Sequence, residues 1–313
     1  MSSCWLFGDI GIERMRLLNE ELKAQALSRA RAELNQPFYR FQPWMSSYRN
    51  RVEFFALAKL SIPEDIWLVT SPTDLGLFGR CFSAIGNGKD LKTLYPMDSG
   101  RRVMEGNSAE VELFRNDFNL ILNFLKTECS VDYKHLTSFV DQIIPITGTN
   151  KGGPPLRANG SGLTTHNYRG GVFISPAIRS HVSDLENVLN LVHELGHTCL
   201  NVYLSCDEII LDSDKLKPVY SVVRKCYRPA LMSFHALVAT AYMYDFILRN
   251  FRQLTSLVQS TRLNERMVHL SKDLEAGLLL CKGLRFSSVG LAILMEIEGL
   301  SSMARGSHKL VLV

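Results

Sequence analysis

The chain has 313 residues, of which 46% are hydrophobic and 21% are charged, and its formal net charge is +4. This composition is that of a globular protein with a sizeable core, and it excludes an intrinsically disordered chain. Because the net charge is small for the length, we expect neither nucleic acid nor an anionic membrane surface as the main partner.

The cysteines and the apolar runs indicate the cellular compartment of the protein. The chain has 7 cysteines and no CxxC pair, which is typical of reduced thiols in the cytoplasm and argues against a cysteine-based zinc site. The first residues have no basic region and carry acidic residues too early for a signal peptide. The most apolar late run, near residues 278–295, is interrupted by Lys282 and Arg285. We therefore expect a soluble cytoplasmic protein without a membrane span.

The first third is predicted to be helical and rich in aromatic residues. An apolar stripe predicts a helix over residues 9–34, which Pro37 ends. The block 38–60 interleaves aromatic residues with arginines. Such a block could stack on a nucleic acid, but it is more typical of a helix-packing core. We assign residues 1–106 to a helical N-terminal region, a candidate for peptide recognition.

The remaining 107–313 are assigned to a helical, metal-binding catalytic domain. Helices are predicted from Ser108 to Leu125 and from about residue 133 to 144, followed by a loop over 145–162 that could move over a site. A short strand is predicted over 171–175. The expected fold class is mainly α with a few short strands, built around a helical metal-binding core.

A single motif dominates the second half of the chain. Ser183 and Glu186 form a capping box at the start of an amphipathic helix. This helix carries the HExxH sequence His193-Glu194-Leu195-Gly196-His197. Two histidines four residues apart share one helix face, so both rings can bind one divalent metal. The competing interpretation is a pair of helical histidines that are only hydrogen-bonded. Gly196 costs about 1 kcal/mol relative to alanine in a helix interior. We therefore expect this glycine to allow close packing or the approach of a substrate.

Known zinc peptidase patterns place the third metal ligand at defined positions, which can be compared with this sequence. The extended form HExxHxxGxxH is excluded because Leu200 and Tyr203 stand at the required Gly and His positions. A second form places a glutamate on a later helix. Here Glu208 and Asp212 lie in a polar linker, which disfavours that form but leaves it open.

His235 is the other candidate for the third ligand. It lies in the apolar stripe of a helix predicted after Pro229, where an unpaired polar ring is costly to bury. A core histidine bonded to a carbonyl is the competing interpretation. Arg224 and Arg228 precede this helix, and a guanidinium near a metal can bind a carboxylate through two hydrogen bonds. A solvent-facing basic loop is the alternative. Helices predicted over 263–284 and 287–300 follow.

The order of these motifs is similar to that of the HExxH-type peptide-modification proteins. This family comprises the iron- and 2-oxoglutarate-dependent peptide β-hydroxylases of ribosomal peptide natural-product clusters. The resemblance covers about residues 114–246 and departs at Val222-Val223, where Pro-Trp is expected, and at 225–227, which replace an acidic, proline-containing spacer. It is carried by the 171–175 strand, the HELGH helix, Tyr220-Ser221, Arg224, Arg228-Pro229 and His235.

The resemblance implies a complete site. Fe(II) would be held by His193, His197 and His235, with 2-oxoglutarate and dioxygen as co-substrates. A precursor peptide would be hydroxylated on a side-chain carbon during natural-product maturation. The far carboxylate of 2-oxoglutarate would bind Arg228 or Arg224, and Glu194 would be an anchor or an extra ligand. The pocket would be lined by residues that include Tyr220 and Thr165.

Two other functions remain open at this point. In a zinc metallopeptidase, His193 and His197 would bind zinc with a downstream carboxylate, and Glu194 would be the general base. In a binding or scaffold protein, the histidines would be structural. The sequence does not indicate the oligomeric state, the peptide or the modified residue.

Overall fold

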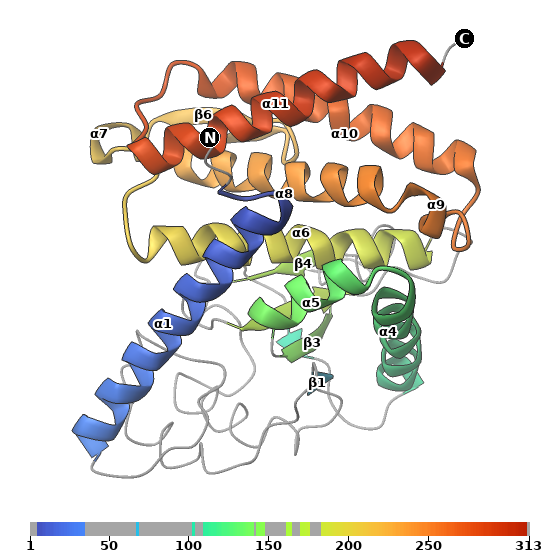
Figure 1. Ribbon diagram of the computed structural model, residues 1–313, viewed down its shortest axis with the longest axis horizontal. Helices are drawn as coiled ribbons and strands as arrows, with labels where there is room; N and C mark the ends of the chain where they lie inside the picture. Colours follow the sequence, from blue (N-terminus) through green and yellow to red (C-terminus); the bar gives the residue numbers. More distant parts are fainter. Residues whose placement is uncertain are drawn as a thin grey trace. The chain divides into compact units, whose positions relative to one another are not determined.

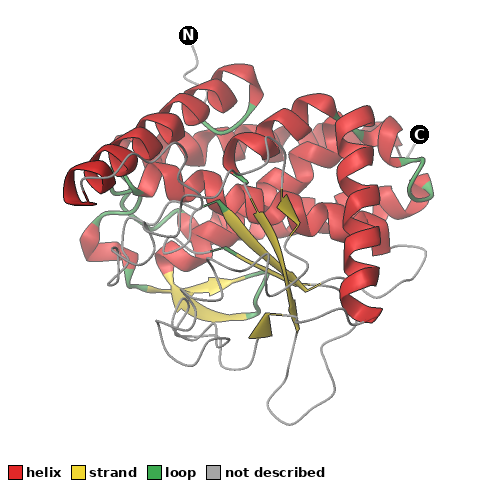
Figure 2. Cartoon of the chain, turned by 90° about the horizontal axis from the view of Figure 1, so that it is seen from below, coloured by secondary structure: helices red, strands yellow, loops and turns green. Residues whose placement is uncertain are grey.

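A computed structural model describes residues 5–34, 67–68, 102–103, 109–140, 142–147, 161–164, 170–175 and 183–311. Over these residues the protein is mainly α-helical with a few short strands, which confirms the predicted fold class (Figure 1). Figure 2 shows that strands make up a small part of the described residues. The aromatic block 38–60, the proposed domain boundary at 106 and Thr165 lie outside the described residues.

The chain forms two compact units, each of which we describe by itself. One unit combines Met1–Leu18 with Val192–Val313, and the other is Asn19–Leu191. Helices α1 (Gly8–Leu34) and α6 (Ser183–Leu204) therefore contribute residues to both units. The HExxH motif, His235 and the two predicted arginines all belong to the first unit.

The unit Asn19–Leu191 contains a small mixed sheet. Its central strand β3 (Gln142–Thr147) is parallel to β5 (Gly171–Ser175) and antiparallel to β2 (Arg102–Val103). β1 (Trp67–Leu68) is parallel to β3, and β4 (Ser161–Leu163) is antiparallel to β5. The apolar side chains of the two central strands are buried, as is usual for parallel strands covered on both faces. Two helices lie between β2 and β3 in the sequence: α4 (Ala109–Glu128) and α5 (Ser130–Phe139).

One predicted helix boundary is wrong. The helix expected to reach residue 144 ends at Phe139, and Ile143 and Ile144 belong to β3. β-branched side chains favour a strand when the sheet can bury them, and both isoleucines are fully buried. The loop expected from residue 145 is likewise wrong at its ends, because β3 runs to Thr147 and β4 begins at Ser161.

The other unit is built from long helices. Helix α8 contributes much of the core, with Phe234, Val238 and Ile247 fully buried. By length and composition α8 could cross a membrane, but 72% of its apolar window is buried inside the protein, and core helices pass the same test. Figure 1 shows α8, α10 and α11 running next to one another. The elements of this unit are α7 (Asp212–Lys215), β6 (Pro218–Ser221), β7 (Cys226–Pro229), α8 (Ala230–Arg249), α9 (Phe251–Leu254), α10 (Ser260–Cys281) and α11 (Ser288–Val311).

Helices α6 and α8 touch at Gly196. A Cβ atom added there would lie 3.0 Å from the Cα of Ala239 and 3.1 Å from the Cβ of Tyr242. Real Cβ contacts are rarely so short, so only glycine allows the backbones to approach this closely. The interpretation of Gly196 as a close-packing residue is therefore confirmed. The contact brings His235, one turn before Ala239, next to the HExxH helix.

The basic segment before α8 is a hairpin rather than a loop. β6 pairs with β7 so that Val219 faces Arg228 and Tyr220 faces Tyr227. The turn ends at Lys225, which has a φ of 52° and donates its backbone N–H to the Ser221 carbonyl at 2.7 Å. This register fixes Arg228 on a paired strand and leaves Arg224 in the turn.

The segment 5–7 is tied to the helices of the same unit. Its backbone N–H groups donate hydrogen bonds to the Glu296 carboxylate of α11. The bond from the Leu6 N–H measures 2.8 Å. The hydroxyls of Tyr203 and Tyr242 donate to carbonyls of the segment at 2.5 and 3.3 Å. Leu6 itself is fully buried. The N-terminal segment thus contacts α6, α8 and α11.

Candidate metal centre

The two histidines of the HExxH motif lie side by side on α6. Their Nε2 atoms are 3.0 Å apart, and the ring planes meet at 88°. With a carboxylate oxygen of Glu194, their ligand atoms all lie within 4.8 Å of one another. Two nitrogens bound to one ion at about 2.1 Å would lie about 3.0 Å apart at a right angle and about 3.4 Å apart at a tetrahedral angle. The spacing therefore fits two ligands of one ion.

The surroundings of both rings favour the neutral form. Burial lowers the pKa of His193 to about 3, and the positive charges of Arg224 and Arg266 lower it as well. Burial also lowers the pKa of His197 far below its ordinary value, and His193 and His235 act in the same direction. Neutral imidazole is the form that binds a metal. The site is therefore in its metal-binding protonation state near neutral pH.

The described residues do not satisfy every hydrogen-bonding atom of the histidine pair. A hydrogen bond between the two Nε2 atoms would have the same 3.0 Å length, which is the competing interpretation. The Nδ1 atom of His197 is nevertheless buried and has no hydrogen-bond partner among the described residues. A buried polar atom in that state costs about 1–3 kcal/mol. An ion bound through Nε2 does not reach Nδ1, so a water or a ligand group on the other side of the ring would offset this cost.

The structure places His235 beside this pair. Its ring centroid lies 5.5 Å from that of His197, with the planes at 42°. His235 falls outside the group of ligand atoms within 4.8 Å of one another, which His193, Glu194 and His197 form. Ligation by His235 therefore requires a side-chain movement when the metal binds. Without that movement the described residues offer Glu194 as the third ligand.

Glu194 is the buried acid of the site. Only 2% of its surface is exposed, and its position directly after His193 places a carboxylate oxygen among the imidazole nitrogens. A buried carboxylate is stabilised by cations or hydrogen-bond donors. Glu194 can therefore act as a ligand, as an anchor for a ligand, or as a base.

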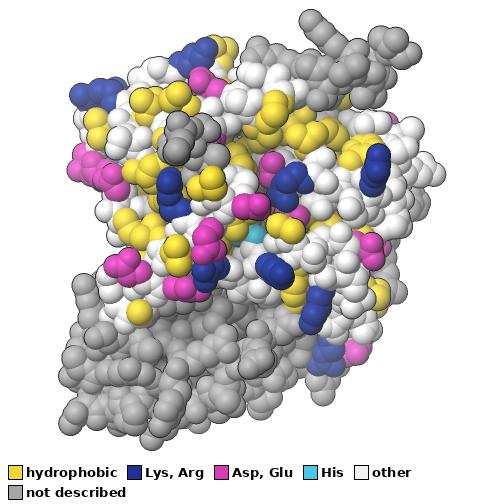
Figure 3. Space-filling view, in the orientation of Figure 1, with side chains coloured by type: hydrophobic (Ala, Val, Ile, Leu, Met, Phe, Trp, Pro, Cys, Tyr) yellow, Lys and Arg dark blue, Asp and Glu magenta, His cyan; other side chains and the backbone are white. Residues whose placement is uncertain are grey.

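The two predicted arginines lie on the hairpin, and their charges act on the histidine pair. Arg224 is exposed in the turn, where its backbone N–H donates to Ser221 Oγ at 3.4 Å. Arg228 is half-buried on β7. The charge of Arg224 lowers the pKa of both motif histidines, and that of Arg228 lowers the pKa of His197. Figure 3 shows basic side chains interspersed with acidic ones around a small area of histidine surface.

A third arginine near the site was not predicted from the sequence. Arg266 of α10 lies close enough for its charge to lower the pKa of His193, and its Nε atom is buried. It belongs to no motif and sits at an ordinary position of an amphipathic helix. Only the tertiary packing brings it near the site, so the sequence carried no signal for it.

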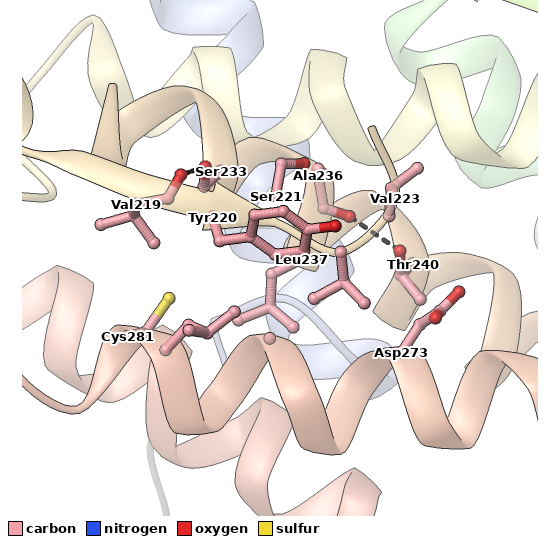
Figure 4. A pocket seen from close by; sticks show the side chains of 13 residues that line it. Val219, Tyr220, Ser221, Val223, Ser233, Ala236, Leu237, Thr240, Asp273 and Cys281 are labelled. Carbon is pink, nitrogen blue, oxygen red and sulfur yellow. Dashed lines mark hydrogen bonds between the residues drawn. The ribbon is translucent and has the colours of Figure 1, made fainter. Parts of the chain in front are cut away.

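Of Tyr220 and Thr165, the two residues predicted to line the pocket, the structure describes only Tyr220. Tyr220 is half-buried on β6, and its ring lies 5.5 Å from that of Tyr227. It lines a pocket between the hairpin, α8 and α10 (Figure 4), and is not part of the His193–Glu194–His197 group. Thr165 lies outside the described residues.

No protein-family model matches the sequence, and no curated protein matches it. The described site could hold one divalent cation through neutral imidazoles beside positive guanidinium charges.

Proposed function

We propose that the protein is an Fe(II)- and 2-oxoglutarate-dependent enzyme that hydroxylates a side-chain carbon of a ribosomally made precursor peptide. One observation carries the proposal: the ring of His235 lies beside the His193–His197 pair. Three imidazoles from two helices can thus be gathered at one ion. A metal held by three protein ligands keeps positions open for other ligands.

The residues of this chain fit the metal and the co-substrate. His193, His197 and His235 would hold the iron, which when bound supplies the activation of dioxygen. The guanidinium of Arg228 or Arg224 would bind the far carboxylate of 2-oxoglutarate, because a planar guanidinium matches a carboxylate with two parallel hydrogen bonds. The charges of both arginines already act on the histidines. Glu194 would anchor a ligand or serve as an additional one.

A zinc metallopeptidase is the second candidate, because Glu194 lies among the imidazole nitrogens where a general base is needed. That mechanism also needs a carboxylate ligand from a later element. Among the described residues, the metal-ligating group includes none from outside α6. Asp212, for example, has 68% of its side chain exposed and pairs with Lys215. His235 also lies outside that group, but its ring is 5.5 Å from that of His197, whereas no later carboxylate of the described residues is in the group. The oxygenase proposal therefore has the stronger support.

The test is metal analysis after anaerobic purification, followed by co-expression with candidate precursor peptides. We expect iron at close to one equivalent, formation of succinate from 2-oxoglutarate, and a peptide heavier by one oxygen atom. The Glu194→Gln variant should keep partial activity. Stoichiometric zinc, peptide cleavage and complete loss of cleavage in Glu194→Gln would establish the peptidase instead.

A further inference from the structure

The hairpin lies in a stretch of sequence that carries cations without acids. From Lys215 to Tyr244 the chain has five lysines and arginines and no aspartate or glutamate. Three of the five, Arg224, Lys225 and Arg228, lie in the turn and the second strand of the hairpin. The positive charge of the hairpin is therefore not balanced by acids of its own segment.

Other parts of the described chain do not balance this charge either. The two lysines before the hairpin pair with Asp212 and Asp214, whereas the three hairpin cations form no ion pair with a described carboxylate. Arginines elsewhere in the same unit, such as Arg249 and Arg262, each pair with an acid about one turn away. The hairpin thus keeps its positive charge available to a partner from outside the chain.

The backbone of the turn holds one of these cations in an uncommon conformation. Among the described residues other than glycine, Lys225 alone has a positive φ, at 52°. Glycine, asparagine and aspartate adopt this conformation more readily than lysine does. Residues held in such conformations cluster at functional sites. A lysine at a position that suits a smaller residue indicates that its charge has a use there.

An exposed aromatic ring lies beside these cations. Tyr227 is 74% exposed, and its ring meets that of Tyr220 at 72°. One side of the exposed ring is thus supported by the neighbouring strand. Tyrosine and arginine are enriched at protein interfaces, where a tyrosine supplies a large contact area. Cations next to a supported ring are suited to contact with a peptide.

We propose that the basic tip of the hairpin, formed by Arg224, Lys225 and Tyr227, is a docking surface for an acidic segment of the peptide substrate. Carboxylates of that segment would pair with the guanidinium and the ammonium group, and its chain would pack on the tyrosine ring. Complementary charge also speeds encounter and disfavours wrong partners. Arg228 is half-buried on β7 and remains the candidate for the co-substrate.

The basic tip lies near the candidate metal centre. The charge of Arg224 acts on both His193 and His197, and β7 leads from the turn into the helix that carries His235. An acidic segment held at the tip would keep the rest of the peptide close to the metal, which raises its local concentration. That the segment belongs to the substrate rests on the proposed function, whereas the preference for acidic residues rests on the hairpin alone.

A nucleic acid is also an anion, but the basic tip fits it less well. Proteins that bind nucleic acids by charge commonly neutralise about 6–10 phosphates, and those that bind single strands stack successive bases on several aromatic rings. The basic tip offers two cations and one exposed ring. An acidic peptide therefore suits this surface better.

The test measures binding without turnover, by fluorescence anisotropy. The full chain, with no metal or 2-oxoglutarate added, is titrated into a labelled peptide of four glutamates flanked by glycines, and into its glutamine analogue. We expect the glutamate peptide to bind about fivefold more tightly at low salt, on the order of what two exposed ion pairs contribute. The preference should shrink at high salt. Equal binding of the two peptides at low salt would overturn the proposal.

Variants identify the residue responsible. Lys225→Asn removes the charge and should reduce the preference to about twofold, and Lys225→Asp reverses the charge and should abolish it. Both variants should fold, because asparagine and aspartate tolerate a positive φ. An unchanged preference in Lys225→Asp would contradict the assignment.

The matched control is Arg252→Gln. Arg252 is an exposed cation on α9 that forms no ion pair with a described carboxylate. It lies at the opposite end of α8 from the hairpin, and a helix of 20 residues is about 30 Å long. This variant should keep the full preference for the glutamate peptide. An equal loss of preference in Arg252→Gln and Lys225→Asn would show a general effect of net charge and would overturn the proposal.

An oligonucleotide of ten thymidines in the same assay tests the other class of partner. We expect it to bind more weakly than the glutamate peptide. Tighter binding of the oligonucleotide, lost in Lys225→Asp, would overturn the assignment to a peptide and make a nucleic acid the partner of the basic tip.

The outcome is separable from that of the proposed function. A preference for the glutamate peptide that depends on Lys225, in a protein that never hydroxylates a peptide, would retain the docking surface and reject the oxygenase. Iron-dependent hydroxylation in a protein without that preference would retain the oxygenase and reject the docking surface.

Discussion

At the scale of single residues, the candidate chemistry depends on two imidazoles that stay neutral. Burial keeps the pKa of both motif histidines low, and arginine charges act in the same direction. A positive surrounding repels a proton, but it also repels a metal cation. An anionic co-substrate such as 2-oxoglutarate would offset that repulsion, so we expect metal and co-substrate to strengthen each other's binding.

The low histidine pKa values predict a pH dependence of stability. An unfolded histidine has a pKa of about 6.5, whereas folded His193 has a pKa of about 3. The unfolded chain therefore binds more protons below pH 6.5. The free energy of unfolding of the metal-free protein should fall as the pH is lowered from about 7 towards 3, by up to about 1.4 kcal/mol per pH unit for each motif histidine. Urea denaturation at several pH values measures this. The His193→Asn/His197→Asn double variant is the control, and an equal slope in that variant would contradict the cause.

Metal affinity distinguishes the two sets of ligands. If His235 supplies the third ligand, His235→Asn should weaken Co(II) binding by at least about tenfold, while Glu194→Gln should weaken it less. Co(II) serves as the probe because its visible spectrum reports coordination. His193→Asn and His197→Asn should abolish binding. Loss of binding in Glu194→Gln together with unchanged binding in His235→Asn would assign all the ligands to α6.

At the scale of elements, the position of His235 is set by the contact between α6 and α8. Gly196→Ala should destabilise the protein by about 1–3 kcal/mol, because the added methyl group meets the α8 backbone. Chemical denaturation measures this loss. Gly299→Ala on α11 is the matched control, since nothing lies within 4 Å of a Cβ atom added there. That variant should gain up to about 1 kcal/mol from helix propensity. Similar behaviour of the two variants would contradict the close contact.

The hairpin structure indicates which of the two predicted arginines is the better candidate for binding 2-oxoglutarate. Arg228 is held by strand pairing and is half-buried, whereas Arg224 is exposed in the turn. A fixed guanidinium loses less entropy when it binds a carboxylate. Arg228→Gln should therefore raise the KM for 2-oxoglutarate by about tenfold or more, and Arg224→Gln by less. Steady-state succinate formation measures both values. The reverse order would assign the co-substrate to the turn.

The sequence predicted the elements with strong local signals. The periodic apolar stripe and Pro229 predicted α8, and the HExxH helix is present from Ser183. It failed where tertiary context decides. Ile143 and Ile144 fit a helix stripe by spacing but are buried in a sheet, and the hairpin carries no glycine-rich turn that would have predicted it. Which side chain completes the metal site depends on packing between helices, which spacing along one helix cannot predict.

At the scale of the whole molecule, the unit that holds the site joins two distant parts of the sequence. The contacts of Glu296 with segment 5–7 span 291 positions between Trp5 and Glu296. No local pattern predicts this pairing, because a lone glutamate on a helix ordinarily faces solvent.

Glu296 should therefore be important for stability. Glu296→Gln leaves one acceptor oxygen and places an NH2 group against backbone donors, so we expect a loss of about 1–3 kcal/mol. Thermal and urea denaturation measure it, with Glu298→Gln, an exposed neighbour on α11, as the control. Equal stability of the two variants would show that the N-terminal segment contributes nothing to this unit.

The pairing between segment 5–7 and α11 also has a consequence for biosynthesis. The ribosome makes Trp5 first and Glu296 only 291 residues later, which at about 5–20 residues per second is roughly 15–60 s. During that time segment 5–7 can bond to the Tyr203 and Tyr242 hydroxyls, which are made earlier, but its contact with α11 is missing. We therefore expect the unit that contains the candidate metal centre to be completed only after α11 has been made.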